Sequence, residues 1–260
     1  MRIALGLEYD GSAFAGWQLQ EPGVPTIQGC VEEALGRIAD HPVRVHCAGR
    51  TDAGVHATAQ VIHFDTSARR PLHAWVLGTN THLPEAVAVR WAREVPEDFH
   101  ARFSATARCY RYLILNRPVR PTFLARRVTW THRPLDEARM AQAGAALVGE
   151  HDFSAYRALG CQAKSPVRTV HRLEVRRRGE LVSLEVEANA FLHHMVRNIA
   201  GVLMEIGSGR RPVGWAREVL EGRDRTLGGV TAPPDGLYLT AVRYPARYGL
   251  PELPQPPLVW

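Results

Sequence analysis

Hydrophobic residues in the first half of the chain recur with two different periods. Residues 3–9 alternate apolar with polar or small positions, which predicts a half-buried strand. Residues 27–38 place apolar side chains at spacings of four, four and three, which predicts an amphipathic helix with Thr26 as its N-cap. The remaining pattern predicts strands at 43–47 and 60–65, a helix at 72–83 and a strand at 86–95. This succession is that of a ferredoxin-like unit.

The second half repeats this rhythm with different lengths. Strand alternation at 110–115 is followed by an Ala-rich helical segment at 136–148. The pattern then predicts a hairpin over 173–186 turned at 178–180, a helix at 191–206 and a last strand at 237–244. We therefore expect an α+β protein, in which two ferredoxin-like α/β units form a largely antiparallel central sheet flanked by helices. The predicted domains are 1–105, 106–246 and a Pro-rich tail at 247–260.

The distribution of charge adds a candidate partner. The chain has 260 residues and a net charge of +6, and Lys164 is its only lysine beside 31 arginines. Genome composition or heat adaptation can produce such an arginine bias. Between residues 90 and 133, however, ten arginines face three acids, a local charge of +7. A one-signed block of this density is typical of a surface that binds a polyanion such as RNA.

Several classes of protein lose their support from the sequence. No apolar run is long enough to span a bilayer and the N-terminus lacks the layout of a signal peptide, so we expect a cytoplasmic protein. The four cysteines stand far apart, which favours neither a disulfide framework nor a zinc site. Motifs of nucleotide-binding folds, P-loop enzymes, zinc proteases and α/β-hydrolases are missing from the sequence.

The segment 47–56 is the most informative candidate site. Gly49 and Gly54 bracket Arg50 and Asp52, so the backbone can turn tightly and present a guanidinium and a carboxylate from a strand end. A structural turn, in which Asp52 caps a nearby amide, is about equally consistent with the spacing. His56 adds a third polar group and favours a functional loop.

Two further segments carry candidate residues. Residues 99–112 interleave aromatic residues with arginines, as proteins that read single-stranded RNA do. We interpret Tyr112 as core, whereas Tyr110 is equally consistent with a core and a functional role. In the segment 189–198 we expect no zinc site, because adjacent helical histidines would diverge by about 100°. Arg197 on this apolar helix needs an anionic partner, and a carboxylate from another segment is the simplest one.

Taken together, these segments resemble the tRNA pseudouridine synthase A family over nearly the whole chain. The matching segments are Tyr9 to Gly11, Gly16 to Gln18, Gly49 to His56, Phe99 to Phe103, Arg108 to Tyr112, Gly149 to Phe153, Phe191 to Arg197 and Gly236 to Leu239. The resemblance implies an isomerase without cofactor or metal, which converts uridine to pseudouridine at positions 38, 39 and 40 of the tRNA anticodon stem-loop. It also implies a homodimer with tRNA as partner and no association with a membrane.

The resemblance also implies a role for individual residues. Asp52 matches the essential aspartate, and Arg50 matches the arginine associated with flipping the base. Tyr110 matches the tyrosine that stacks on the target uracil, and Arg197 matches the basic residue that pairs with the aspartate. An apolar patch behind the site corresponds to Leu237 and Leu239.

Two other functions fit part of the sequence. A non-catalytic RNA-binding module or RNA chaperone would account for the basic block. A glycoside or nucleoside hydrolase could use Asp52 with a second carboxylate such as Asp10. Neither explains why all of the segments occur together.

Overall fold

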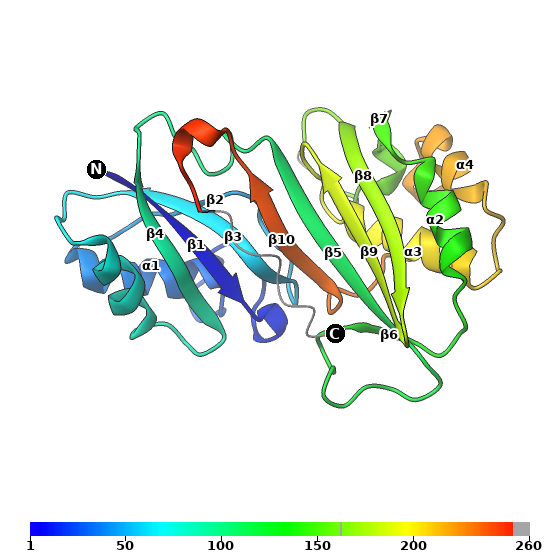
Figure 1. Ribbon diagram of the computed structural model, residues 1–260, viewed down its shortest axis with the longest axis horizontal. Helices are drawn as coiled ribbons and strands as arrows, with labels where there is room; N and C mark the ends of the chain where they lie inside the picture. The colour runs from blue at the N-terminus through cyan, green and yellow to red at the C-terminus, as the bar shows by residue number, and fades with distance from the viewer. Residues whose placement is uncertain (162, 252–260) are drawn as a thin grey trace. The chain divides into compact units, whose positions relative to one another are not determined.

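The computed structural model describes residues 1–161 and 163–251, which form two compact units (Figure 1). Among the described residues, the first unit contains 1–106 and 238–251, and the second contains 107–237 apart from residue 162. Both units combine β-sheet with helices, and their strands pair mostly in the antiparallel sense. The predicted α+β class is therefore confirmed.

The first unit follows the predicted ferredoxin-like succession. Its elements are β1 (Arg2–Tyr9), α1 (Ile27–Ala39), β2 (His46–Cys47), β3 (His56–Asp65), the helical segment 72–80 with the π-helix η2 (Ala74–Gly78) at its centre, and β4 (Val87–Val95). The sheet order is β4, β1, β3, and β2 also pairs with β3. Strand β1 is antiparallel to both β3 and β4. Thr26 caps α1 as expected, because its side chain accepts a hydrogen bond from Gly29 N at 3.3 Å.

The last strand belongs with the first unit. Strand β10 (Leu237–Arg243) pairs in parallel with β3, where Tyr238 lies opposite His56. After β10, Tyr244 and Tyr248 pack on the buried ring of Phe99, at centroid distances of 5.2 and 5.0 Å. This grouping differs from the predicted domain 106–246, because a pairing between distant segments leaves no trace in local periodicity. Residues 252–260 of the predicted tail lie outside the described residues.

The second unit is built around a long antiparallel hairpin. Its strands are β5 (Ala107–Asn116), β6 (Thr129–Thr131), β7 (Gly149–Asp152), β8 (Val167–Arg178) and β9 (Leu181–Ala188), and its helices are α2 (Glu137–Ala145), α3 (Met195–Gly207) and α4 (Trp215–Gly222). The sheet order is β5, β9, β8, β7. The predicted turn at 178–180 is confirmed, and Gly179 takes the left-handed conformation there, with φ +59°.

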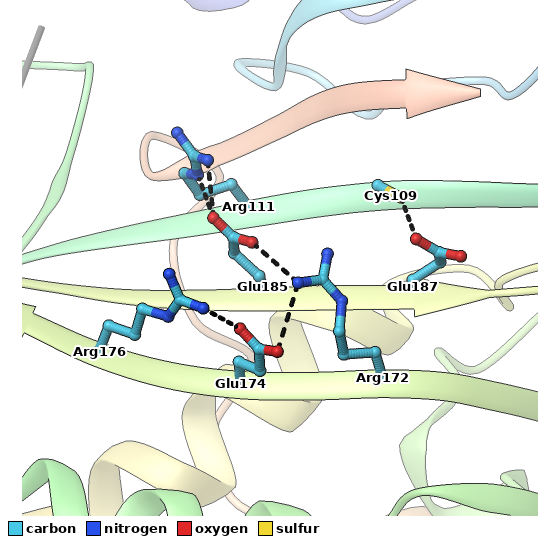
Figure 2. Close-up of polar contacts among 7 residues, drawn as sticks. All are labelled: Cys109, Arg111, Arg172, Glu174, Arg176, Glu185 and Glu187. Atoms are coloured by element: carbon cyan, nitrogen blue, oxygen red, sulfur yellow. Dashed lines mark hydrogen bonds and ion pairs between the residues drawn. The ribbon is translucent and has the colours of Figure 1, made fainter. Parts of the chain in front are cut away.

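The two faces of this hairpin differ sharply in chemistry. Apolar residues of β9 such as Val182, Leu184 and Val186 are buried. The alternate positions form a row of ion pairs across β5, β9 and β8 (Figure 2). Glu185 accepts hydrogen bonds from the Arg111 guanidinium at 3.0 and 2.6 Å. Part of the basic block therefore neutralises acids of the protein itself.

A buried histidine gives the first unit a defined response to acid. The ring of His63 on β3 is almost fully buried, and its Nδ1 accepts a hydrogen bond from Ala101 N at 3.1 Å. Burial, with a smaller contribution from His100, lowers the pKa of His63 to about 3. In the unfolded chain a histidine titrates near its ordinary pKa of about 6.5.

We expect the free energy of unfolding to fall as the pH is lowered from 7 to 5. Between the two pKa values the unfolded chain binds one more proton than the folded protein, so His63 costs up to about 1.4 kcal/mol of stability per pH unit. Substitution His63→Asn keeps an acceptor for Ala101 N and should flatten this slope. Urea unfolding of both proteins at pH 7 and pH 5 measures this pH dependence. An equal change in the free energy of unfolding in the two proteins would contradict the low pKa of His63.

Candidate functional site

The loop that carries Asp52 connects β2 to β3 in the first unit. Asp52 is half-buried, and its backbone oxygen accepts a hydrogen bond from Val55 N at 3.1 Å, which closes a tight turn. Gly54 within this turn has φ +78°, a conformation that residues with a side chain rarely adopt. Strand β3 begins at His56 rather than at residue 60 as expected, because pairing with Tyr238 extends it. Asp52 therefore lies in the turn that leads into a long, paired strand.

A buried chain of side-chain hydrogen bonds holds both sides of this loop. The Gln60 amide on β3 donates to Gly49 O at 2.7 Å and to the Tyr9 hydroxyl at 3.3 Å. Tyr9 in turn shares a hydrogen bond of 2.8 Å with the Thr51 hydroxyl, one residue before Asp52. Gln60 and Thr51 are both buried. Such a satisfied network fixes the loop backbone and keeps the position of Asp52 defined.

Sequence analysis missed Gln60. The available signal was a neutral polar residue in a strand between Ala59 and Val61, where neighbouring positions are apolar. A buried amide in that position needs partners, and the loop backbone and Tyr9 provide them.

Two glycines in the segment between β1 and α1 allow this segment to pack against the Asp52 loop. A Cβ on Gly11 would lie 2.0 Å from Val55 O, and one on Gly16 would lie 2.9 Å from Thr51 O. Backbone hydrogen bonds accompany this contact, from Trp17 N to Thr51 O at 2.9 Å and from Gly54 N to Phe14 O at 3.3 Å. Gly11 and Gly16, in the segments 9–11 and 16–18, are therefore explained by their contact with the Asp52 loop.

His56 and Asp10 are part of this scaffold. The His56 ring is buried and stacks on Tyr238 with centroids 4.6 Å apart, and its Nδ1 accepts a hydrogen bond from Gly11 N at 3.1 Å. Asp10 accepts hydrogen bonds from the backbone and hydroxyl of Ser12 at 3.0 and 2.6 Å, as the cap of a short turn. These contacts assign Asp10 a structural role, which weakens the hydrolase alternative.

Arg50 lies in the same loop as Asp52 and is exposed. Burial raises the pKa of the nearby Cys47 thiol to about 12. The positive charge of Arg50 acts in the opposite direction, but its effect is smaller. The thiol therefore stays protonated at neutral pH and is a poor nucleophile. The loop thus presents one carboxylate and one guanidinium, as the spacing indicated.

Tyr110 and Arg197 lie in the second unit. Tyr110 on β5 is largely buried, and its ring meets Phe191 edge to face at a centroid distance of 5.0 Å. Arg197 is half-buried in the first turn of α3, and its Nε donates to Ala232 O at 2.8 Å. Ala232 N donates to Arg197 O at 3.2 Å, so the segment at 232 is tied to this turn. Tyr112 is fully buried and hydrogen-bonded to Thr129, which confirms the core interpretation.

The predicted helix at 191–206 begins four residues late. Helix α3 starts at Met195, and His194 before it adopts the left-handed conformation with φ +60°. The preceding segment is held instead by Asn189, whose side chain accepts from Ala190 N at 2.7 Å and from Thr169 N on β8 at 3.1 Å. His193 and His194 therefore precede the helix, so the expected helical divergence of about 100° between the two histidines does not apply.

Leu237 and Leu239 stand two residues apart at the start of β10. Both are buried, and Leu239 lies opposite Ala57 of β3, one residue after His56. Strand alternation places the two leucines on one side of β10. Their place behind the site, which the resemblance implies, stays a prediction.

Comparison with known proteins decides the family. A model of the family described as tRNA pseudouridine synthase matches residues 7–104 and 143–245. The chain belongs to the tRNA pseudouridine synthase family. Relatives named tRNA pseudouridine synthase A include those of Nitrosococcus oceani, 62% identical over all of both chains, and Methylococcus capsulatus, 63% identical over 96% of this chain and 92% of the relative. The relative from Pseudomonas aeruginosa is 61% identical over 96% of this chain and 88% of its own length.

Among residues 1–161 and 163–251, no helix combines the length and the apolar character needed to cross a bilayer.

Proposed function

We propose that this protein converts uridine to pseudouridine at positions 38, 39 and 40 of the tRNA anticodon stem-loop, with Asp52 as the catalytic carboxylate. Isomerisation of uridine in tRNA follows from the family. The observation that supports Asp52 is the construction of its loop. A hydrogen-bond chain and two close-packed glycines hold one half-buried carboxylate at a strand end. The alternative of a non-catalytic RNA-binding module or RNA chaperone is not favoured, because RNA binding alone gives no reason to hold the Asp52 carboxylate in a fixed position.

The reaction exchanges one bond for another at the same sugar carbon. The bond between N1 of uracil and C1′ breaks, and the uracil rotates. A bond then forms between C5 and C1′, C5 loses its proton, and N1 gains a proton. Asp52 can act as a nucleophile at C1′, which gives a sugar ester, or as a base, which gives a glycal. Atoms and electrons balance in both routes without an oxidant or reductant, so neither route needs a redox cofactor. From the resemblance to the family we propose that no cofactor and no metal takes part.

The uracil must leave the base stack before this chemistry can begin, which costs a few kcal/mol. We assign Arg50 to the place of the flipped base, because its exposed guanidinium shares the loop with Asp52. Tyr110 would stack on the uracil, with Leu237 and Leu239 as the apolar surface behind it. Arg197 would pair with the carboxylate and keep it ionised.

The proposal includes a homodimer in the cytoplasm, where the tRNA substrate is found. The dimer rests on the resemblance to the family, whose two subunits form the tRNA cleft. Light scattering on the purified protein measures the mass in solution.

We expect tRNA binding to weaken steeply with salt. Arginines of the block at 90–133 that remain exposed, such as Arg120 and Arg133, can neutralise phosphates and release counterions. Others already pair with acids, including Arg90 with Glu8 at 2.7 Å and Arg117 with Glu180 at 3.2 Å. With at least two phosphate contacts, affinity should fall by about tenfold or more between 50 and 200 mM salt. Filter binding of a tRNA transcript measures this, and a flat dependence would count against the surface.

The target positions are tested with transcripts that differ only at these sites. Transcripts carrying uridine singly at position 38, 39 or 40, and one carrying none, are incubated with the protein and mapped for pseudouridine. The proposal expects conversion in the first three and none in the fourth. Conversion confined to another part of the tRNA would refute the assignment of positions while leaving the family activity in place.

A further inference from the structure

The two phenylalanines of the segment after β4 have opposite environments. Phe99 is 0% exposed and belongs to the core, whereas Phe103, four residues later, is 75% exposed. In the sequence this segment is one stretch of aromatic residues with arginines. The structure separates a core residue from an outward-facing ring.

The backbone that carries Phe103 is rigid. Ser104 N donates to His100 O at 2.8 Å, and the Ser104 hydroxyl accepts from His100 N at 2.9 Å. The Nδ1 atom of His100 accepts from Arg102 N at 3.1 Å and from Phe103 N at 3.4 Å. An exposed aromatic ring on a fixed turn loses little conformational freedom when a ligand stacks on it.

The Phe103 ring packs against the ring of His100, which in turn contacts a second histidine. Its centroid lies 4.4 Å from that of His100, which lies 5.3 Å from the exposed His46 on β2. Burial first, and then the charges near it, lower the pKa of His100. The ring of His100 is therefore neutral at physiological pH and supports Phe103 as an aromatic surface. We call Phe103, His100 and His46 the aromatic platform.

Positive charge and the catalytic loop border this platform. The Arg102 guanidinium carbon lies 5.5 Å from the centre of the Phe103 ring. Arg102 and Arg50 both lie close enough to Cys47 to favour its thiolate form. Cys47 follows His46 directly and leads into the loop of Asp52. The aromatic platform therefore adjoins the site of chemistry, within the same unit.

We propose that Phe103 stacks on an unpaired base of the tRNA next to the reacting uridine, with Arg102 contacting the adjoining phosphate. This inference rests on the proposed function and extends it to a second nucleotide. A base offers a flat face to the ring and a phosphate to the guanidinium, so one nucleotide satisfies both groups. The neutral ring of His100 beside Phe103 adds aromatic surface without adding a competing charge.

The test compares Phe103→Ala and Phe103→Trp with Leu77→Ala, which removes an apolar side chain of similar exposure (65%) from the helical segment of the same unit. Loss of a stacked base should weaken binding of a tRNA transcript by roughly 5- to 100-fold in Phe103→Ala. Phe103→Trp should restore it, and Leu77→Ala should bind as the original protein does. Equal binding by Phe103→Ala would overturn the proposal.

A series of transcripts with single abasic sites identifies the contact. At the stacked position, removal of the base should abolish the difference in tRNA affinity between the original protein and Phe103→Ala, as expected when the base and Phe103 interact directly. If the difference persists at every abasic position, or if Phe103→Ala changes only the oligomeric state, Phe103 contacts something other than a base and the proposal fails. Absence of turnover in the original protein would instead refute the proposed function, since the binding comparison does not depend on catalysis.

Discussion

Asp52→Asn is expected to abolish isomerisation while leaving tRNA binding nearly intact. An amide of the same shape can neither attack C1′ nor accept a proton, so turnover should fall by at least about 10³-fold. Asp52 lies in a loop whose backbone is held by Thr51 and Gln60, so the neutral variant should keep the fold. Release of tritium from uracil C5 in a labelled transcript measures turnover.

Arg50→Lys provides a matched control for this experiment, because it keeps the charge of the same loop and leaves the carboxylate in place. It should reduce turnover far less than Asp52→Asn, since lysine can still occupy space beside the flipped base. Binding of the transcript should change by less than about threefold in Asp52→Asn. Substantial C5 tritium release by Asp52→Asn would remove this residue from the chemistry.

Gly11→Ala is expected to have the second largest effect, although Gly11 carries no functional group. The added Cβ would lie 2.0 Å from Val55 O and 2.6 Å from Val55 C, and these are backbone atoms that cannot rotate away. The end of the Asp52 loop must move, which should cost about 1–3 kcal/mol of stability. A shift of about 1 Å in a catalytic group can lower kcat/KM by roughly 10²-fold.

Gly36→Ala is the control for this clash. Gly36 lies inside α1, where an added Cβ would meet His41 O at an ordinary distance of 3.5 Å. Alanine should therefore raise the free energy of unfolding by about 0.5–1 kcal/mol and leave kcat/KM unchanged. Urea unfolding and steady-state kinetics measure both variants, and full activity in Gly11→Ala would show that the contact does not position the loop.

Local periodicity predicted most of the secondary structure because the relevant information is short in range. Strand β1 and helix α1 alternate or repeat their apolar residues within a few positions, and Thr26 caps the helix through Gly29 three residues away. The hairpin of β8 and β9 was predicted for the same reason. Its turn at Gly179 and the alternation of Leu184 with Glu185 are both visible within the segment.

The two elements whose starts were predicted wrongly depend on contacts between residues far apart in the sequence. Asn189 accepts a hydrogen bond from Thr169 N on β8, and α3 begins only at Met195. Strand β3 begins early because Tyr238 pairs with His56. Neither partner can be inferred from the local pattern, so the boundaries of both elements were misplaced.

The candidate site divides in the same way. The loop of Arg50 and Asp52 could be predicted from its glycines and its charges. The support from Gln60 and the contact at Gly11 could not, because both involve residues from other strands or connections. The roles of all the predicted site residues stay predictions, and substitution of each in the C5 tritium assay tests them: Asp52, Arg50, Tyr110, Arg197, Leu237 and Leu239.

The proposed role of the Asp52 carboxylate in isomerising tRNA uridines can be tested in cells. Cells that lack this protein are complemented with either the original protein or Asp52→Asn at equal abundance, and pseudouridine is mapped in their tRNA. We expect pseudouridine at positions 38, 39 and 40 with the original protein and unmodified uridine there with Asp52→Asn. The same pseudouridine map in both strains would contradict this role.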